Sequence, residues 1–371
     1  MKVLNTIFPL LVVLPTSALG LSAEAAQMSR AMLQQAMSSP SGKLTLSPEI
    51  LVPDPRDPTS ILLHGPAVIS LSNDIRLKAK ANTAFVVADS LGSYRTFCKE
   101  QEEARGNFPG PVPVVYCAKD SSNVEGILED MADVAETGVS GFLVAINEGS
   151  EISSLDDISG DADWMKVCKA VLDCGMQPIP EITMKDETAT TWKEDDVESL
   201  VDKLAEIMGE DPVSVLLTIN SSSDEESSDE EEEAEAPEAL PLPTVRKALG
   251  KRVPILASVR SNAGGGRMGQ ETAHIKDSGF TGAVLRRECV PGFPNNPSVE
   301  FSSEFWSACI GDLKSTKSKT FDFRSKNNME VTLGTKWANL QNDVMGSGAL
   351  GAMEDNAPPG FDSESGDYQG F

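Results

Sequence analysis

The chain has 371 residues, of which 40% are hydrophobic and 24% are charged, a composition typical of a globular protein. At roughly 100–200 residues per domain, this length fits one large domain with appendages, or two small ones. The formal net charge is −26. Such an excess of acid argues against a nucleic-acid partner, because displacing counterions from phosphates requires a basic surface. The chain has only two histidines, which excludes a multi-histidine metal site, and the sequence points to no metal or other cofactor.

The N-terminal residues have the features of an export signal. Lys2 precedes the apolar run Ile7–Leu14, which is followed by the small residues of Ser17–Gly20. This order of charge, short apolar run and small residues predicts a signal peptide over residues 1–20. No later run reaches the ~20 apolar residues of a membrane span, so we expect no membrane span in the mature protein.

Residues 21–46 have the composition of a second targeting segment. They contain Arg30 and Lys43 against a single acid, Glu24, and an amphipathic helix is predicted over residues 27–37. An acid-poor segment rich in Ala and Ser is typical of a transit peptide. A signal followed by a transit segment resembles the bipartite leaders of algae with complex plastids. The sequence therefore predicts a plastid location, with secretion as the alternative.

The six cysteines are widely spaced and form no Cys-x-x-Cys pair. Such diffuse spacing in a large domain favours buried thiols over a disulfide framework. The six are Cys98, Cys117, Cys168, Cys174, Cys289 and Cys309.

Short apolar runs recur along the chain, and each ends in polar residues. Near-continuous apolar runs are typical of strands buried on both faces, as in parallel sheets covered by helices. Eight runs are predicted as strands: Ala67–Ser72, Ala84–Asp89, Pro113–Ala118, Gly141–Asn147, Pro178–Thr183, Val213–Asn220, Pro254–Arg260 and Gly282–Arg287.

The segments between these runs have helical patterns that end at glycine. Alternating strands and helices predict a (β/α)8 (TIM) barrel over residues 60–316, with a doubly wound open sheet as the alternative. The predicted helices are Asp74–Ala81, Val124–Thr137, Trp164–Cys174, Val197–Met208, Pro243–Leu249 and Met268–Ser278.

Two segments do not fit the barrel pattern. Residues 221–238 carry ten acidic side chains and no basic one, which predicts a disordered loop after the sixth strand. This loop is a candidate contact for a basic protein partner, and a solvated linker is the alternative. Residues 317–371 form a polar C-terminal extension that is predicted to be partly disordered.

In such barrels, catalytic side chains lie at the carboxyl ends of the strands. The polar residues there include Lys119, Glu181 and Asn220 as catalytic candidates. A carboxylate inside an apolar strand needs a partner because burying an isolated charge is costly. We therefore expect Glu181 to face the interior and to pair with Lys119 as an acid–base pair. The alternative is a structural ion pair.

A glycine-rich loop follows the seventh strand. Its glycines, Gly264, Gly265 and Gly266, precede a predicted helix and are preceded by Ser258 and Arg260. Backbone amides at such a loop bind anions well. Together with Arg286, these residues are candidates for binding the phosphate of a small phosphorylated metabolite, whereas the alternative is a flexible loop.

Residues Val253–Cys289 resemble the last two βα units of indole-3-glycerol-phosphate synthase, one of the ribulose-phosphate-binding barrels. The matching stretches are Ser278–Phe280 and Ala283–Leu285, and Glu288 falls on a glutamate of that family. The resemblance implies an aldolase-type TIM barrel with lyase activity.

The resemblance also implies roles for single residues. Val114–Asp120 looks like the third strand of the family, which makes Lys119 its general acid. Glu181 looks like the glutamate of the fifth strand, Asn220 like the asparagine of the sixth, and Ser258 like the serine of the seventh.

The chain departs from the family in three places. Ile69–Asn73, in the predicted first strand, supplies neither the glutamate nor the lysine of the family. Arg286 and Arg287 stand where a glycine is expected, and Ser221 replaces an arginine. Without the lysine of the first strand, the chain lacks a positive charge that would stabilise the reacting centre, and this weakens the synthase reaction of the family. We therefore expect a non-catalytic interaction or regulatory protein, with an active lyase or isomerase as the alternative.

Overall fold

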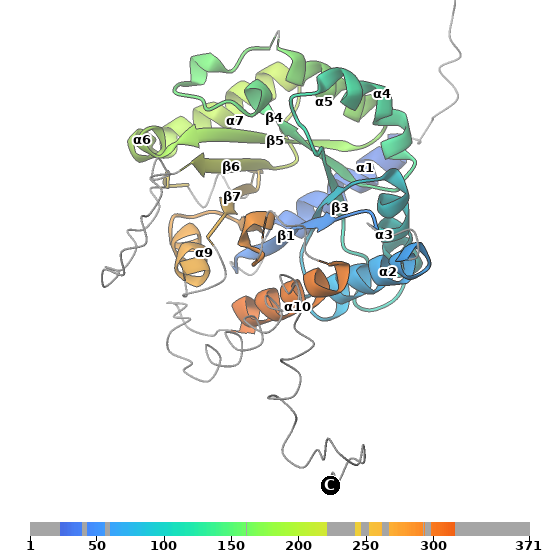
Figure 1. Cartoon of the computed structure of the whole chain (residues 1–371). Helices are drawn as coiled ribbons and strands as arrows, with labels where there is room; N and C mark the ends of the chain where they lie inside the picture. Colours follow the sequence, from blue (N-terminus) through green and yellow to red (C-terminus); the bar gives the residue numbers. More distant parts are fainter. Residues whose placement is uncertain are drawn as a thin grey trace, which may run out of the picture.

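Eight parallel strands pair in chain order and close into a barrel, because β8 (Gly282–Leu285) pairs with β1 (Thr45–Val52) (Figure 1). The computed structural model describes residues 23–38, 43–55, 60–160, 162–220, 242–245, 252–261, 267–291, 293 and 298–315. The predicted (β/α)8 barrel is confirmed, and the open sheet is excluded.

The other strands are β2 (Ala84–Ala88), β3 (Val114–Cys117), β4 (Gly141–Ala145), β5 (Gln177–Lys185), β6 (Val215–Asn220) and β7 (Ile255–Val259). The helices are α1 (Ala23–Met37), α2 (Ile61–Leu77), α3 (Leu91–Glu103), α4 (Val124–Ala135), α5 (Asp163–Asp173), α6 (Asp186–Thr191), α7 (Glu194–Met208), α9 (Arg267–Asp277) and α10 (Val299–Ser315). Short 3-10 turns occur at Ile146–Gly149, Leu155–Asp157 and Arg287–Cys289.

The prediction of the first strand was wrong. Residues 67–72 lie within α2, so the barrel begins with β1, ahead of the predicted boundary at residue 60. The burial of α2 has a helical period, since Val68, Leu71 and Ile75 are buried while Ile69 is exposed. A six-residue apolar run does not distinguish a strand from a buried helix.

The remaining seven predicted strands are confirmed to within a few residues. The predicted helices over 124–137, 164–174, 197–208 and 268–278 are also confirmed, and the glycines after them have φ values from 78° to 94°. Such values favour glycine, which has no Cβ to clash. Of the predicted helix Pro243–Leu249, only residues up to Val245 are described.

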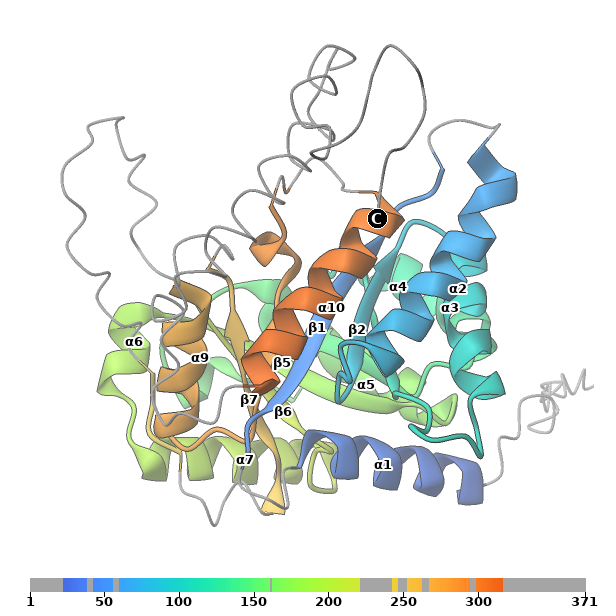
Figure 2. The ribbon, with the colours of Figure 1, turned by 90° about the horizontal axis from the view of Figure 1, so that it is seen from below.

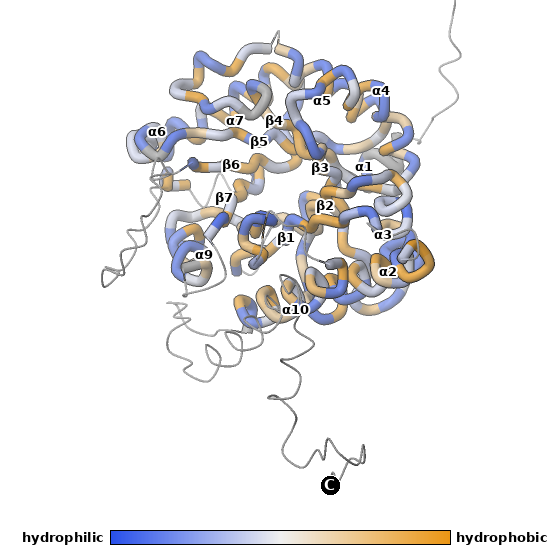
Figure 3. Tube along the Cα trace, in the orientation of Figure 1, coloured by the Kyte–Doolittle hydropathy of each residue, from blue (hydrophilic) through white to orange (hydrophobic). Residues whose placement is uncertain are grey.

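The hydrophobic core has two layers. One fills the barrel, and the other lies between the strands and the surrounding helices. Figure 3 shows hydrophilic and hydrophobic residues alternating around the helices, as expected for helices that cover a barrel. The inner layer includes Phe85, Val87, Val115, Leu143, Ile179, Leu216, Leu256 and Val284.

The predicted amphipathic helix over residues 27–37 is confirmed as part of α1. It lies beneath the strands at the end of the barrel where β1 begins (Figure 2). Among the described residues, no helix is both long and apolar enough to cross a membrane. The predictions for residues 1–20, 221–238 and 317–371 lie outside the described residues.

Candidate functional site

The inward-facing positions of the barrel change from apolar to polar near the carboxyl ends of the strands. Successive residues of a strand face opposite sides, so every second residue points inward. We define the interior cluster as five such residues from five strands or strand ends: Glu49, Glu181, Thr218, Ser258 and Arg286.

Arg286 lies at the centre of the interior cluster. Its Nε atom is 2.6 Å from Oε2 of Glu49, and its Nη1 atom is 3.0 Å from Oε1 of Glu181. The side chains are 12% exposed for Arg286, 4% for Glu49 and 11% for Glu181. A single guanidinium therefore joins the first, fifth and eighth strands by charge pairs that are nearly shielded from water.

Two hydroxyl groups extend the interior cluster to β6 and β7. Thr218 donates a hydrogen bond of 2.7 Å to Oε1 of Glu181. The hydroxyls of Thr218 and Ser258 are also 2.7 Å apart. Glu181 is thus fixed from two sides, by a cation and by a hydroxyl donor.

A second arginine brings the local charges close to balance. Nε of Arg287 lies 3.6 Å from Oε1 of Glu49 and 3.9 Å from Oε1 of Glu288. Burial raises the pKa of Glu49 above its usual value of 4.5, although Arg286 acts in the opposite direction. Burial also raises the pKa of the Cys117 thiol, which faces the same space. Burial therefore makes Glu49 easier to protonate than an exposed glutamate.

The structure separates two residues that the sequence predicted to pair. Glu181 binds Arg286, whereas Nζ of Lys119 lies 2.6 Å from Oδ1 of Asp89 at the rim, where the lysine side chain is 68% exposed. The predicted Lys119–Glu181 pair is therefore wrong. Arg286, which directly follows β8 and is itself only 12% exposed, is the cation that reaches Glu181 inside the barrel.

Asn220 and Arg260 also lie at the rim. Nη1 of Arg260 donates to Oδ1 of Asn220 at 2.5 Å, and Nδ2 of Asn220 donates to Oε1 of Glu151 at 2.8 Å. Nζ of Lys185 lies 3.6 Å from the other oxygen of Glu151. These four residues form a polar chain beside β5, β6 and β7. Among the described residues, no hydrogen bond or ion pair joins these four residues to the interior cluster.

The expected phosphate loop is described only in part, since Gly264, Gly265 and Gly266 fall outside the described residues. At its start, the backbone amide of Ser261 donates to Oε2 of Glu271 at 3.3 Å. Glu271 is 8% exposed, and burial raises its pKa. A carboxylate therefore already accepts a backbone amide at the start of the loop that the sequence predicted to bind phosphate.

The sequence interpretation missed three residues that contact this centre: Glu49, Thr218 and Arg287. The alternation of β6 would have revealed Thr218, which lies two residues before Asn220 on the same face. Glu49 was missed because the predicted first strand, residues 67–72, lies in α2, whereas Glu49 belongs to β1. Among the described residues, no group of three or more His, Cys, Asp or Glu side chains is arranged to hold a metal ion.

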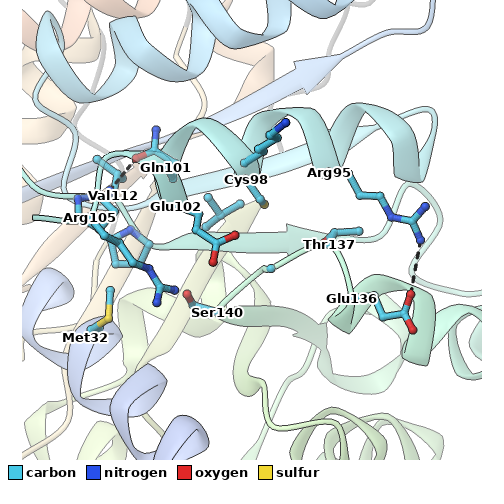
Figure 4. Close-up of a pocket in the computed structure, with 15 residues that line it drawn as sticks. Met32, Arg95, Cys98, Gln101, Glu102, Arg105, Val112, Glu136, Thr137 and Ser140 are labelled. Carbon is cyan, nitrogen blue, oxygen red and sulfur yellow. Dashed lines mark hydrogen bonds and ion pairs between the residues drawn. The ribbon is translucent and has the colours of Figure 1, made fainter. Parts of the chain in front are cut away.

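A separate cleft of about 280 Å³ lies at the opposite end of the barrel (Figure 4). Met32 of α1, Arg105 beyond α3 and Ser140 ahead of β4 line it, and Arg95 is 3.7 Å from Glu136 at its edge. Its walls include residues just before β3 and β4, so the cleft is remote from the carboxyl ends of the strands.

No protein-family model matches the sequence, and a search of curated proteins finds no match. Solved barrels are distantly similar. A truncated 3-deoxy-D-arabino-heptulosonate 7-phosphate synthase from Thermotoga maritima has a TM-score of 0.41 and 10% identity, covering 74% of this chain and 86% of that chain. A 2,3-dimethylmalate lyase of the PEP mutase/isocitrate lyase superfamily has a TM-score of 0.36 and 13% identity, covering 88% and 98%.

Orotidine 5'-phosphate decarboxylase from Pyrococcus horikoshii has a TM-score of 0.33 and 11% identity, covering 70% of this chain and 99% of that chain. The TIM-barrel architecture of the present chain rests on its own strand pairing.

Proposed function

We propose that this protein is a lyase or isomerase that acts on a small phosphorylated metabolite at the carboxyl end of the barrel. The supporting observation is the interior cluster, in which Glu49, Glu181 and Arg286 are buried together. Buried ion pairs are weak contributors to stability compared with apolar packing. A centre with two carboxylates and a cation is, however, well suited to proton transfer beside an anionic substrate.

The position of β1 strengthens the resemblance to indole-3-glycerol-phosphate synthase. The family has a glutamate and a lysine in its first strand, and β1 supplies a glutamate, Glu49. Leu51, two residues later on the same face, stands where the lysine is expected. One of the three departures is therefore reduced to a single missing lysine, while those at Arg286 and Ser221 persist.

Each residue of the interior cluster has a proposed task. Glu49 exchanges a proton with the substrate, because its raised pKa brings proton exchange closer to neutral pH. Arg286 supplies positive charge toward the anionic group. Thr218 and Ser258 position Glu181. Lys119, Asn220 and Arg260 are proposed to contact the substrate at the rim of the barrel.

A thermal-shift screen against sugar phosphates and inorganic phosphate tests this function. A ligand that binds the native state raises the melting temperature by mass action. We expect at least one sugar phosphate to stabilise the wild type and to lose that effect in Glu181→Gln. The exposed Glu129→Gln on α4 is the matched control and retains the ligand shift. The proposal fails if no phosphate compound stabilises the wild type.

A non-catalytic role is the second candidate, and the charge balance of the interior favours it. Arg286 and Arg287 neutralise Glu49 and Glu181 without any ligand. In that case, residues 221–238 are proposed to contact a basic protein. The full chain would bind polylysine in a salt-sensitive manner, and deletion of 221–238 would weaken the binding. Equal binding by both chains would contradict this role.

We also propose a plastid location, on the basis of the leader-like composition of residues 1–46, with secretion as the alternative. Fusion of residues 1–46 to a fluorescent protein in an alga with complex plastids tests it. Fluorescence inside the plastid supports the proposal, and fluorescence in the medium contradicts it.

A further inference from the structure

Helix α1 closes the amino-terminal end of the barrel. Leu33 and Met37 are both 0% exposed and belong to the same hydrophobic cluster as the side chains inside the barrel. The contact is close, because a Cβ added to Gly141 would lie 3.1 Å from Cδ1 of Leu33. Gly141 is the first residue of β4, so Leu33 fills the entrance between strands.

Polar contacts attach α1 to the starts of several strands. The hydroxyl of Ser29 donates to the carbonyl of Ser140 at 2.9 Å, just before β4. Arg30 donates through Nη1 to Gln177 at the start of β5 at 3.4 Å, and through Nη2 to the carbonyl of Asp211 at 2.5 Å. Nη1 of Arg30 also forms a 3.0 Å ion pair with Glu210.

Two further contacts complete the attachment. Nε2 of Gln34 donates to the carbonyl of Arg252 at 3.5 Å, ahead of β7. The hydroxyl of Thr45, the first residue of β1, donates to the carbonyl of Met37 at 3.3 Å. Helix α1 therefore contacts the amino ends of β1, β4, β5 and β7, and the segment before β6. Through Met32 it also forms one wall of the cleft in Figure 4.

We propose that proteolytic removal of the leader stops ahead of α1, so that the mature protein begins at or before Ala23. This inference rests on the leader proposed above, and it restricts the part of residues 1–46 that is cleaved off to the residues ahead of α1. Cleavage at residue 46, the end of the predicted transit segment, would remove α1 together with Thr45 and Leu46 of β1. It would expose the apolar interior at this end of the barrel to water, which is unfavourable. The targeting-like composition of residues 27–37 has a structural use, since its apolar face enters the barrel and Arg30 meets acidic residues.

Terminal-peptide mass spectrometry of the mature protein, purified from its own cells, tests the proposal directly. We expect the N-terminal residue to lie after Met1 and at or before Ala23, whereas an N-terminus at Met1 would contradict the leader itself. An N-terminus within or after α1 would overturn the proposal.

Variants in the full chain test whether α1 closes the barrel. Leu33→Asp should lower the melting temperature by on the order of 10 °C or prevent folding, and Leu33→Ala should lower it by about half as much. Met28→Asp on the same helix is the control, because Met28 is 61% exposed, and its melting temperature should match the wild type. A Leu33→Ala protein as stable as the wild type would contradict the closure of the barrel by α1.

Discussion

Arg286 holds two buried carboxylates, and this makes it the most sensitive residue of the interior cluster. Arg286→Met would leave Glu49 and Glu181 without their shared cation inside the barrel. Removing one partner of a buried charge pair costs about 3–5 kcal/mol. We expect a loss of this size in the free energy of unfolding near pH 7, measured by urea denaturation.

The exposed pair of Lys119 and Asp89 is the control for this experiment. Lys119→Met removes a rim charge that solvent screens, and we expect a change below about 1 kcal/mol. Similar losses in Lys119→Met and Arg286→Met would show that burial does not distinguish the two pairs.

The raised pKa of Glu49 predicts a specific pH dependence. A carboxyl group whose pKa is higher in the folded state stabilises the fold below its unfolded value, and this contribution is lost as pH rises through the folded pKa. Glu49→Gln removes the titration. Its stability relative to the wild type should therefore rise with pH above the usual value of 4.5 and level off beyond the folded pKa.

Urea unfolding of both proteins from about pH 4 to pH 8 measures this difference. A difference in stability that is constant over this interval, or that falls with rising pH, would contradict a raised pKa of Glu49.

The cysteines differ in accessibility. Five are buried, and burial raises the pKa of Cys98, Cys168 and Cys309 to about 12. Cys174 is partly exposed, although burial raises its pKa too. Because the thiolate is the reactive form and must be reached by the reagent, Cys174 should be alkylated first in the native protein. Peptide mass spectrometry after brief iodoacetamide treatment checks this, and prior labelling of any other cysteine would contradict it.

At the scale of the elements, the meeting of β8 with β1 and β7 depends on a residue without a side chain. A Cβ on Gly282 would lie 2.1 Å from the hydroxyl of Thr45 and 2.7 Å from Cδ2 of Leu256. Gly282→Ala therefore requires the side chains of Thr45 and Leu256 to move at the point where the barrel closes. We expect a loss of about 1–3 kcal/mol in the free energy of unfolding, as for other overpacked sites.

Gly311→Ala is the matched control, because an added Cβ on this α10 residue meets nothing within 4 Å. Alanine favours the helix over glycine by about 0.8–1.0 kcal/mol, so this variant should be more stable than the wild type. A Gly282→Ala protein as stable as Gly311→Ala would contradict the close packing at this closure.

The elements also show which parts of the fold the sequence determines locally. Seven strands were predictable because each is an apolar run, and six of the seven begin with or directly after a glycine or proline. The first strand, β1, was not, since Pro48 and Glu49 interrupt its apolar pattern and the partner of Glu49 comes close only in the closed barrel. Glu49 meets Arg286, which lies more than two hundred residues away along the chain. Neither β1 nor the pairing of Glu49 with Arg286 could therefore be predicted from the residues near Glu49 in the sequence.

At the scale of the whole molecule, the same reasoning explains how much of the candidate site was predictable. The rule that polar residues at the carboxyl ends of the strands gather at one end of a barrel correctly placed Glu181, Ser258 and Arg286. Alternation does not decide which cation a buried carboxylate binds, because that depends on depth within the barrel. Lys119 ends at the rim with Asp89, whereas Arg286 reaches inward.

The net charge of −26 predicts how the molecule responds to salt. Repulsion between like charges acts against the compact state, and it reaches across about 30 Å at 0.01 M salt but only about 8 Å at 0.15 M. The melting temperature should therefore rise as sodium chloride is added over this range. Deleting residues 221–238 removes ten acidic side chains and should make the rise smaller. Scanning fluorimetry of both chains over a salt series measures it. A melting temperature that falls with salt in the full chain would mean that favourable surface ion pairs outweigh the repulsion.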